Sequence, residues 1–256
     1  MLIDELKNIA RNNGIVGAGG AGFPAYAKMT EKADTVILNC VECEPLLKLH
    51  RQLLATHTEE IIQMLDEVRE SFGAKEAVIG IKSEYVTTIK AIEEVIGDFP
   101  NVRICALKAA YPMGDEVVLI YEATGRVIKP GGLPIDENVV VYNVETMYNL
   151  YRAVHLNIPV TNKLVSIVGE IDHPLTVRVP LGTTVKEAIS LAGKITVEDP
   201  AYVMGGPMMG RLGTENTVIT KTTNAIIILP KDHHVVVRME KNLDIEKRRA
   251  SSSCCQ

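Results

Sequence analysis

Short runs of apolar residues alternate with amphipathic segments along the first 160 residues of the chain. The runs are nearly continuous, as in strands that are buried on both faces of a sheet, and they cover residues 35–38, 77–81, 102–107 and 139–141. Between them, apolar residues return at three- and four-residue spacing, which predicts helices. These cover residues 2–13, 47–72, 84–96 and 145–154, and a further helix opens in the 111–116 segment and ends at about residue 123. Strands that alternate with helices favour an α/β domain with a parallel sheet.

The pattern changes near residue 161. Strands are predicted over residues 163–168, 175–179 and 225–229, with one helix at about 184–192 and a turn-rich insert at 205–210. This mixture indicates a small α+β module of the β-grasp type. The predicted domains are therefore residues 1–160 and 161–232, and the polar residues 233–256 are expected to form a linker or a helix.

Five glycines fall within residues 14–22, and Lys28 follows six residues after the last of them. A segment this bare exposes its backbone N–H groups and can form a concave nest for phosphate oxygens, to which Lys28 would add a mobile positive charge. The segment matches neither the Walker A motif nor the plain GxGxxG turn. The alternative is a flexible surface loop, although Phe23 and Pro24 are unusual in a linker.

Polar residues follow the predicted strands, at the edge where α/β sheets bind ligands. Asn39, Glu42 and Glu44 come directly after one strand, and their side chains could accept hydrogen bonds from ribose hydroxyls or ring N–H groups. A solvated loop is the alternative. Helix capping is an alternative role for Asp115 and Glu116 and for the 143–146 segment, since polar side chains stabilise a helix N-terminus.

The composition excludes several classes of protein. The net charge is −5 and no basic block precedes residues 247–249, so a nucleic-acid partner is not expected. No apolar run approaches the roughly 20 residues of a membrane span. Five unevenly placed cysteines do not form a disulfide framework, and a reducing cytoplasm is the expected compartment.

Cys40 and Cys43 are separated by two residues and leave three interpretations open. The pair could be a redox dithiol, half of a zinc site, or two buried or loop thiols. The last is favoured because no nearby Cys or His pair offers two further ligands. His50 and His57 could share one helix face, where packing or solvation is a better explanation than metal binding.

Taken in order, the motifs resemble a known family. They are Gly17-Ala18-Gly19-Gly20-Ala21-Gly22-Phe23-Pro24, Lys28, Asn39-x-x-Glu42-x-Glu44-Pro45, Tyr111-x-x-Gly114-Asp115-Glu116 and Asn143-Val144-Glu145-Thr146. The chain resembles the flavin-binding 51 kDa subunit of respiratory complex I. It is more similar still to the C subunit of Rnf electron-transport complexes and to the cobalamin reductase of propanediol-utilisation microcompartments.

The resemblance implies FMN in a Rossmann-like domain, NADH as hydride donor, and a β-grasp domain of the soluble-ligand-binding type. The residues that would contact FMN are Gly17, Gly19, Gly20, Lys28, Asn39, Glu42, Tyr111, Gly114, Val141, Asn143 and Thr146. Those that would meet NADH are Phe23, Glu44 and Glu116, with the two glutamates acting in catalysis. The family's Asn-Asn pair reads Tyr142-Asn143 here, and the aromatic that stacks on adenine has no counterpart near residues 129–133.

The resemblance also bears on the end of the sequence, Cys254-Cys255-Gln256. In the similar reductases a ferredoxin-like cysteine run begins here, and such runs hold [4Fe–4S] clusters through thiolates. By that match Cys254 is the first cluster ligand of a longer protein, with at least three more cysteines beyond this sequence. The fragment alone is then expected to hold no iron and to have disordered last residues. A tail with two incidental cysteines is the alternative.

Two functional hypotheses follow. In the first, the chain is an NADH-oxidising, FMN-dependent electron-transfer module whose partner is an iron–sulfur or corrin acceptor protein, in a membrane complex or a bacterial microcompartment. In the second, it is a non-catalytic nucleotide-binding or scaffold module. The complete motif set favours the first hypothesis, and the absent adenine-stacking aromatic favours the second.

Overall fold

The computed structural model describes residues 1–241 of the chain. It divides into two compact units. The first comprises residues 1–43 and 48–160, and the second comprises residues 44–47 together with the chain from residue 161 onward. Residues 242–256, and with them the predicted cluster ligand Cys254, lie outside the described residues.

The first unit is built on a sheet of four parallel strands in the order β3-β2-β1-β4. The strands are β1 (Thr35–Cys40), β2 (Glu76–Lys82), β3 (Val102–Leu107) and β4 (Val139–Asn143). The chain builds outward from β1 to β3 and then returns to place β4 on the other side of β1. The junction of β1 and β4 is therefore the switch point of the sheet, where α/β folds bind their ligands. The register pairs Asn39 with Asn143 across this junction.

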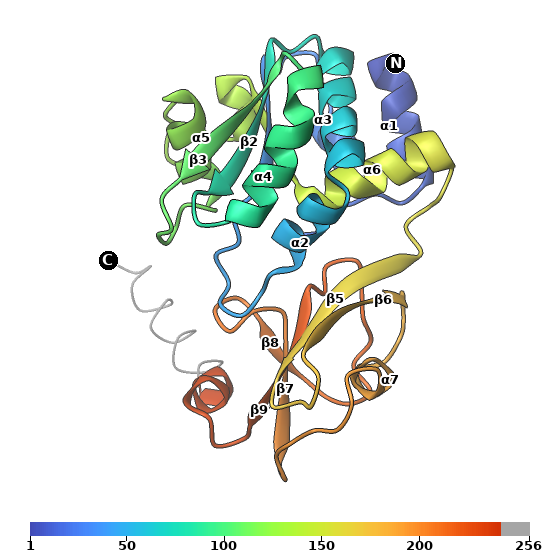
Figure 1. Ribbon diagram of the computed structural model, residues 1–256, viewed down its shortest axis with the longest axis vertical. Coiled ribbons are helices and arrows are strands. Elements are labelled where there is room, and N and C mark those ends of the chain that lie inside the picture. Colours follow the sequence, from blue (N-terminus) through green and yellow to red (C-terminus); the bar gives the residue numbers. More distant parts are fainter. Residues whose placement is uncertain (242–256) are drawn as a thin grey trace. The chain divides into compact units, whose positions relative to one another are not determined.

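Helices cover both faces of this sheet (Figure 1). They are α1 (Ile3–Asn12), α2 (Leu49–Thr56), α3 (Thr58–Phe72), α4 (Val86–Val95), α5 (Glu116–Thr124) and α6 (Val144–Leu156), with short 3₁₀ turns η1 (Ala25–Lys28), η2 (Ile96–Asp98) and η3 (Pro134–Glu137). On one face, Leu119 and Ile120 of α5 pack against Ile37, Val78 and Val141 of the strands. On the other face, α3 and α6 contact the central strands. Burial on both faces explains why β1, β2 and β4 read as continuous apolar runs, whereas Arg103 and Ala106 of the edge strand β3 are exposed.

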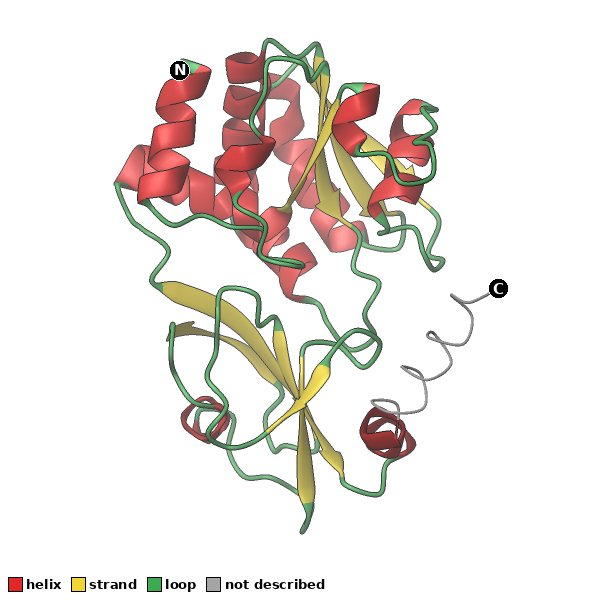
Figure 2. Ribbon diagram, turned by 180° about the vertical axis from the view of Figure 1, so that it is seen from behind, coloured by secondary structure: helices red, strands yellow, loops and turns green. Residues whose placement is uncertain are grey.

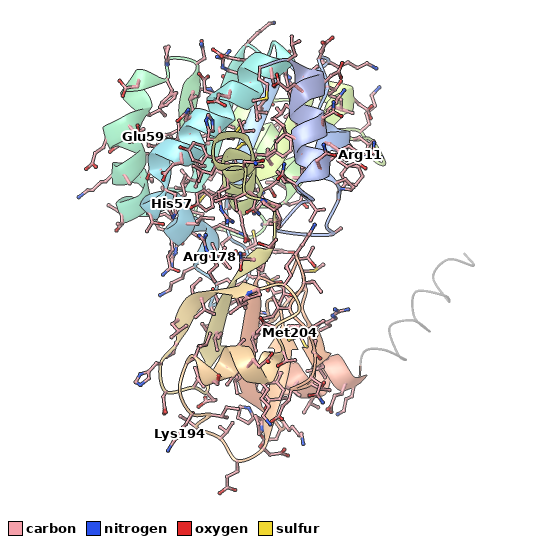
Figure 3. All side chains as sticks on the ribbon, turned by 90° about the vertical axis from the view of Figure 1, so that its right-hand side faces the viewer. Arg11, His57, Glu59, Arg178, Lys194 and Met204 are labelled. Atoms are coloured by element: carbon pink, nitrogen blue, oxygen red, sulfur yellow. The ribbon has the colours of Figure 1, made fainter. Side chains whose placement is uncertain are left out.

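The single helix predicted over residues 47–72 is wrong, because the chain breaks between α2 and α3. His57 stands at the break with φ −130° and ψ 43° (Figure 3). The hydroxyls on either side of it compete for helix carbonyls, since Thr56 bonds to the carbonyl of Gln52 at 3.0 Å and Thr58 to that of Leu54 at 2.7 Å. The apolar periodicity continues through the break, which is why the pattern alone does not reveal it.

The second unit contains a mixed five-stranded sheet in the order β6-β5-β9-β7-β8. Figure 2 shows the strands of this unit in yellow. Its elements are β5 (Asn162–Gly169), β6 (Leu175–Pro180), α7 (Val185–Ser190), β7 (Pro200–Met204), β8 (Arg211–Gly213) and β9 (Ala225–Pro230). Val185 and Ile189 of α7 pack into a core with Val165 and Ile226. The predicted helix and three of these strands are confirmed, as is the general fold of an α/β domain followed by a β-rich module.

Two strands of the second unit, β7 and β8, are absent from the prediction. Proline opens β7, and β8 has only three residues, so neither shows a clear alternation of apolar and polar side chains. The turn-rich segment at 205–210 joins them. Beyond β9, residues 234–241 are helical, and Val236 is fully buried in a cluster with Leu47, Val203 and Ile227. Within residues 1–241, no helix is both long and apolar enough to span a membrane.

Candidate functional site

A cavity of about 350 Å³ opens at the carboxyl ends of β1 and β4. Its wall combines the glycine-rich loop, the ends of the two strands and the first turns of α5 and α6. The lining residues are Gly17, Gly19, Gly20, Ala21, Gly22, Phe23, Ala25, Lys28, Asn39, Glu116, Val141, Tyr142, Asn143 and Thr146. The cavity therefore occupies the switch point of the sheet, where the topology predicts a ligand.

The glycine-rich loop is closed at its base and tied to α6. The amide of Gly17 donates to the carbonyl of Phe23 at 2.8 Å. The hydroxyl of Thr146 accepts from the amide of Ala18 at 3.0 Å and donates to the carbonyl of Val16 at 3.3 Å. Thr146 is 1% exposed, so a single buried hydroxyl fixes the loop base at both residues.

The tip of the loop presents bare backbone to the cavity. The amides of Gly19 and Gly20 have no hydrogen-bond partner among the described residues. A side chain at Gly19 would meet the amide nitrogen of Asn143 at 2.5 Å, whereas one at Gly20 would meet nothing within 4 Å. The loop thus needs glycine at position 19 for a close approach to β4, and its free N–H groups suit an anionic oxygen.

Lys28 and Glu116 form an ion pair in the cavity wall. The ammonium of Lys28 lies 3.2 Å from the Oε1 atom of Glu116 and donates to the carbonyl of Val141 at 3.3 Å. Asp115 caps α5 by accepting from the amide of Val117 at 3.0 Å, which makes Glu116 the first helical residue. The capping interpretation is confirmed for Asp115, while Glu116 turns its side chain to the cavity.

Asn39 connects the end of β1 to the loop that precedes α5. Its Nδ2 atom donates to the carbonyl of Gly114 at 3.0 Å, and its Oδ1 atom accepts from the amide of Val41 at 3.0 Å. The amide of Gly114 donates to the sulfur of Cys43 at 3.2 Å. A side chain at Gly114 would overlap the carbonyl of Val41 and reach 2.7 Å from that sulfur. Gly114 is thus required for backbone packing.

The thiols form no metal centre in the part of the chain that the structure describes. Cys40, Cys43 and Cys105 are free, and no group of three His, Cys, Asp or Glu side chains is placed to hold a metal ion among residues 1–241. Cys40 is 1% exposed, and burial raises the pKa of its thiol. Cys40 is thus a buried thiol and Cys43 a half-buried thiol of the loop after β1, and the redox interpretation of the pair stays a prediction.

Asn143 stands at the centre of a second set of polar contacts. Its Oδ1 atom accepts from the amide of Glu145 at 2.9 Å and caps α6. Its Nδ2 atom lies 3.3 Å from the Nε2 atom and 3.4 Å from the Nδ1 atom of His50. The Nδ1 atom of His50 lies 3.3 Å from the Oε2 atom of Glu42, and both of these side chains are nearly buried. A polar chain thus runs from the interior to the cavity wall.

Tyr142 forms a structural contact. The family resemblance predicts an asparagine at this position. It is 3% exposed, and its hydroxyl donates to the carbonyl of Ala25 at 3.3 Å. Burial raises the pKa of this phenol. The side chain thereby links β4 to η1, the turn that carries Lys28.

The cavity brings together most of the residues predicted from the sequence. Those in its wall are Gly17, Gly19, Gly20, Phe23, Lys28, Asn39, Glu116, Val141, Asn143 and Thr146. Those outside the wall are Glu42, Glu44, Tyr111 and Gly114. Tyr111 is 70% exposed, and the predicted FMN contacts of Glu42, Tyr111 and Gly114 remain predictions. The sequence indicates the position of Tyr142 only through the asparagine pair of the resembling family, and no sequence motif includes His50.

Glu44 belongs to the second unit. Its Oε2 atom accepts from the amide of Met208 at 2.9 Å, and its Oε1 atom accepts from the amide of Met209 at 2.7 Å. A side chain at Gly206 would overlap this carboxylate. The turn at 205–210 therefore encloses Glu44 in an anion-binding arrangement of backbone amides. The predicted contact of Glu44 with NADH remains a prediction.

Residues 10–152 match the family of the Nuo51 FMN-binding domain, and residues 164–212 match the SLBB domain. The first match covers the whole cavity wall. The second begins within β5 and ends within β8 of the second unit. One family match thus falls in each unit, in the order that the sequence predicts.

Several curated proteins are similar over most of this chain. Cobalamin reductase PduS of Salmonella typhimurium is 41% identical over 236 residues, which are 92% of this chain and 52% of that protein. The C subunit of the Na⁺-translocating ferredoxin:NAD⁺ oxidoreductase complex of Acetobacterium woodii is 32% identical over 235 residues, which are 90% of this chain and 53% of that protein. The chain thus spans about half the length of these relatives.

A solved structure has the same fold. A chain of the NAD⁺-reducing [NiFe]-hydrogenase in the H₂-reduced state superimposes with a TM-score of 0.73 over 93% of this chain and 49% of that chain. The sequence identity is 20%, so this likeness speaks for the fold alone.

Proposed function

Because this chain belongs to the Nuo51 FMN-binding domain family, we propose that it is an FMN-dependent module that takes hydride from NADH and passes single electrons to iron–sulfur clusters. The observation that carries the proposal is the cavity at the switch point of the sheet. There the bare amides of Gly19 and Gly20, the ammonium of Lys28 and the asparagines at the ends of β1 and β4 surround one space.

The residues present fit FMN. Backbone amides without partners among the described residues, in a cavity that a lysine also lines, are the kind of donors that a phosphate monoester requires. Gly20 leaves open space beside the loop, which a Cβ atom would otherwise enter. We assign the phosphate and ribityl chain to Gly17, Gly19, Gly20 and Lys28, and the flavin ring to the wall formed by Asn39, Val141, Asn143 and Thr146.

The protein supplies position and electrostatics, and the cofactor supplies the redox chemistry. When bound, FMN converts a two-electron hydride transfer into single-electron steps. Phe23 is 52% exposed at the cavity and offers an apolar surface on which a nicotinamide could pack. Glu116 holds Lys28 at 3.2 Å and is proposed to face the nicotinamide side of the same space. These residues would bring the nicotinamide carbon close to the flavin and exclude water.

The path beyond the flavin is proposed from the relatives, whose names describe a cobalamin reductase and a ferredoxin:NAD⁺ oxidoreductase complex. We infer that the full-length protein carries [4Fe–4S] clusters beyond this module, with Cys254 as the first ligand. The partner is then an iron–sulfur or corrin electron acceptor. It would belong either to a membrane complex or to a microcompartment.

One experiment separates this proposal from a non-catalytic module. The purified chain is saturated with FMN, freed of excess cofactor, and mixed with NADH without oxygen. We expect the flavin absorbance to bleach and one-electron dyes to be reduced. Phe23→Ala should slow bleaching at unchanged FMN content. Retained FMN without bleaching would instead support a scaffold that binds the nucleotide. This second function is favoured by one observation, namely that both carboxylate oxygens of Glu44 accept hydrogen bonds from backbone amides.

A further inference from the structure

We propose that Tyr142 is a positioning residue for the flavin site, and that it acts on Lys28 through the turn η1. The inference rests on the proposed function. Tyr142 belongs to the cavity wall, yet it is 3% exposed, so its buried ring offers almost no surface to a ligand. Its contribution to flavin binding is therefore made through its neighbours.

The hydroxyl of Tyr142 reaches a distant segment of the chain. It donates to the carbonyl of Ala25 at 3.3 Å, across 117 positions of the sequence. Ala25 is the first residue of η1 and is itself buried, so the contact lies in the interior. An asparagine at position 142, as the family resemblance predicts, lacks the ring and is too short to reach that carbonyl. In this chain an internal contact thus replaces a ligand contact.

The turn η1 has little internal support. Its four residues form a 3₁₀ turn, and such turns have poorer hydrogen-bond geometry than an α-helix. The amide of Ala27 donates to the carbonyl of Pro24 at 3.1 Å. The amide of Met29 donates to the carbonyl of Tyr26 at 3.2 Å. Contacts from outside the turn therefore help to decide where its last residue, Lys28, is placed.

The strand β4 holds both ends of this turn. At one end, the hydroxyl of Tyr142 bonds to Ala25. At the other end, the carbonyl of Val141, the preceding residue of β4, accepts from the ammonium of Lys28 at 3.3 Å. β4 is the outer strand of its sheet, so one side of its backbone has no neighbouring strand. Two consecutive residues of β4 thus fix the start of η1 and the side chain at its end.

This arrangement presents Lys28 to the phosphate of the ligand. A lysine ammonium carries three protons. The carbonyl of Val141 and the Oε1 atom of Glu116, at 3.2 Å, are its two acceptors among the described residues. The third proton is left for a phosphate oxygen in the cavity. Because riboflavin lacks the phosphate, Tyr142 favours FMN over riboflavin without contacting either ligand.

The first test needs no cofactor. Tyr142→Phe deletes the hydroxyl and keeps the ring, so it releases Ala25 and preserves most of the packing. Hydrogen exchange at the amides of Ala27 and Met29 should accelerate severalfold in the protein without ligand. Unchanged exchange at both amides would overturn the proposal, whether or not the chain binds FMN. Failure of the parent chain to bind any flavin would instead refute the proposed function.

The second test measures selectivity. Tyr142→Phe should weaken FMN binding about fivefold, which corresponds to one lost hydrogen bond, and leave riboflavin binding unchanged. In a Lys28→Met background the same substitution should cause no further loss of FMN affinity. An equal loss for the two flavins, or a loss that persists in the Lys28→Met background, would show that the tyrosine acts by general packing and that the proposal is wrong.

The matched control is Tyr148→Phe. Tyr148 is also buried, and its hydroxyl lies 3.3 Å from the Nε2 atom of His57, but it lies outside the cavity wall. This variant should keep the selectivity of the parent chain for FMN over riboflavin. Thermal melting verifies that both phenylalanine variants are folded. An equal loss of selectivity in the two variants would contradict a specific role for Tyr142.

Discussion

The carboxylate of Glu44 accepts a hydrogen bond from the backbone amide of Met209 at 2.7 Å, although the two residues are 165 positions apart in the sequence. Together with the bond from Met208 at 2.9 Å, this contact gives both carboxylate oxygens a partner within the second unit. Glu44 thus organises the turn between β7 and β8. Its expected role at the nicotinamide can be separated from this one by experiment.

Glu44→Gln should loosen that turn. The new amide group has one acceptor oxygen instead of two, so one of the amides of Met208 and Met209 loses its partner, at a cost of about 1–2 kcal/mol in unfolding free energy. Hydrogen exchange at these two amides should accelerate, with FMN content unchanged. Glu198→Gln, at an exposed position of the same unit, is the control. Unaltered exchange combined with a raised KM for NADH would make Glu44 a nucleotide ligand.

Lys28→Met should weaken FMN binding and leave riboflavin binding nearly unchanged. The two ligands differ by the phosphate, which the proposal assigns to Lys28 and the glycine-rich loop. A charge-assisted contact contributes ~1.5–3 kcal/mol, which corresponds to roughly a 10- to 150-fold loss of affinity. Quenching of flavin fluorescence measures both ligands. Lys32→Met, at an exposed position nearby, should affect neither. An equal loss of affinity for the two flavins would mean that Lys28 does not contact the phosphate.

Thr146→Val should reduce FMN affinity by about five- to thirtyfold, because one buried hydroxyl holds the loop base through Ala18 and Val16 and each of the two bonds contributes ~1 kcal/mol. Valine keeps the shape and removes both bonds. Thr146→Ser keeps the hydroxyl and should bind FMN nearly as well as the parent chain. Equal affinities for the serine and valine variants would show that the hydroxyl does not organise the loop.

Gly114→Ala should destabilise the first unit by ~1–3 kcal/mol, since the added methyl group would overlap the carbonyl of Val41 and crowd Cys43. Gly97→Ala provides the matched control, because a Cβ atom there meets nothing within 4 Å. Thermal or denaturant unfolding of the two variants measures the difference. Equal stabilities would mean that the loop before α5 adjusts to the methyl group without cost.

The apolar pattern predicts much of the fold because most strands are buried and long enough to show it. The four strands of the first unit are recognised from runs such as residues 35–38 and 77–81. The pattern fails where a local polar contact decides the structure. The helix is interrupted at His57, where the hydroxyls of Thr56 and Thr58 bond to helix carbonyls, and the three residues of β8 are too few to show any period.

The candidate site was predictable where one segment carries its own chemistry. Bare glycines followed by Lys28 indicate an anion site in isolation, and Asn39 follows a predicted strand at the edge where α/β sheets bind ligands. Asn143 is different, because the residues alone indicate a helix cap there and only the family resemblance assigns it to the flavin. Contacts between distant segments are not visible in the sequence. His50 and Asn143 are 93 residues apart, and the bond from Gly114 to the sulfur of Cys43 spans 71 residues. Only the folded chain reveals these pairs.

The most direct test of the central claim is a crystal structure of this chain grown with saturating FMN. The account predicts flavin density in the cavity at the ends of β1 and β4, with the phosphate against the amides of Gly19 and Gly20 and within reach of Lys28, and with the ring beside Asn143. An FMN molecule bound elsewhere on the chain, or a cavity without flavin density at saturation, would contradict it.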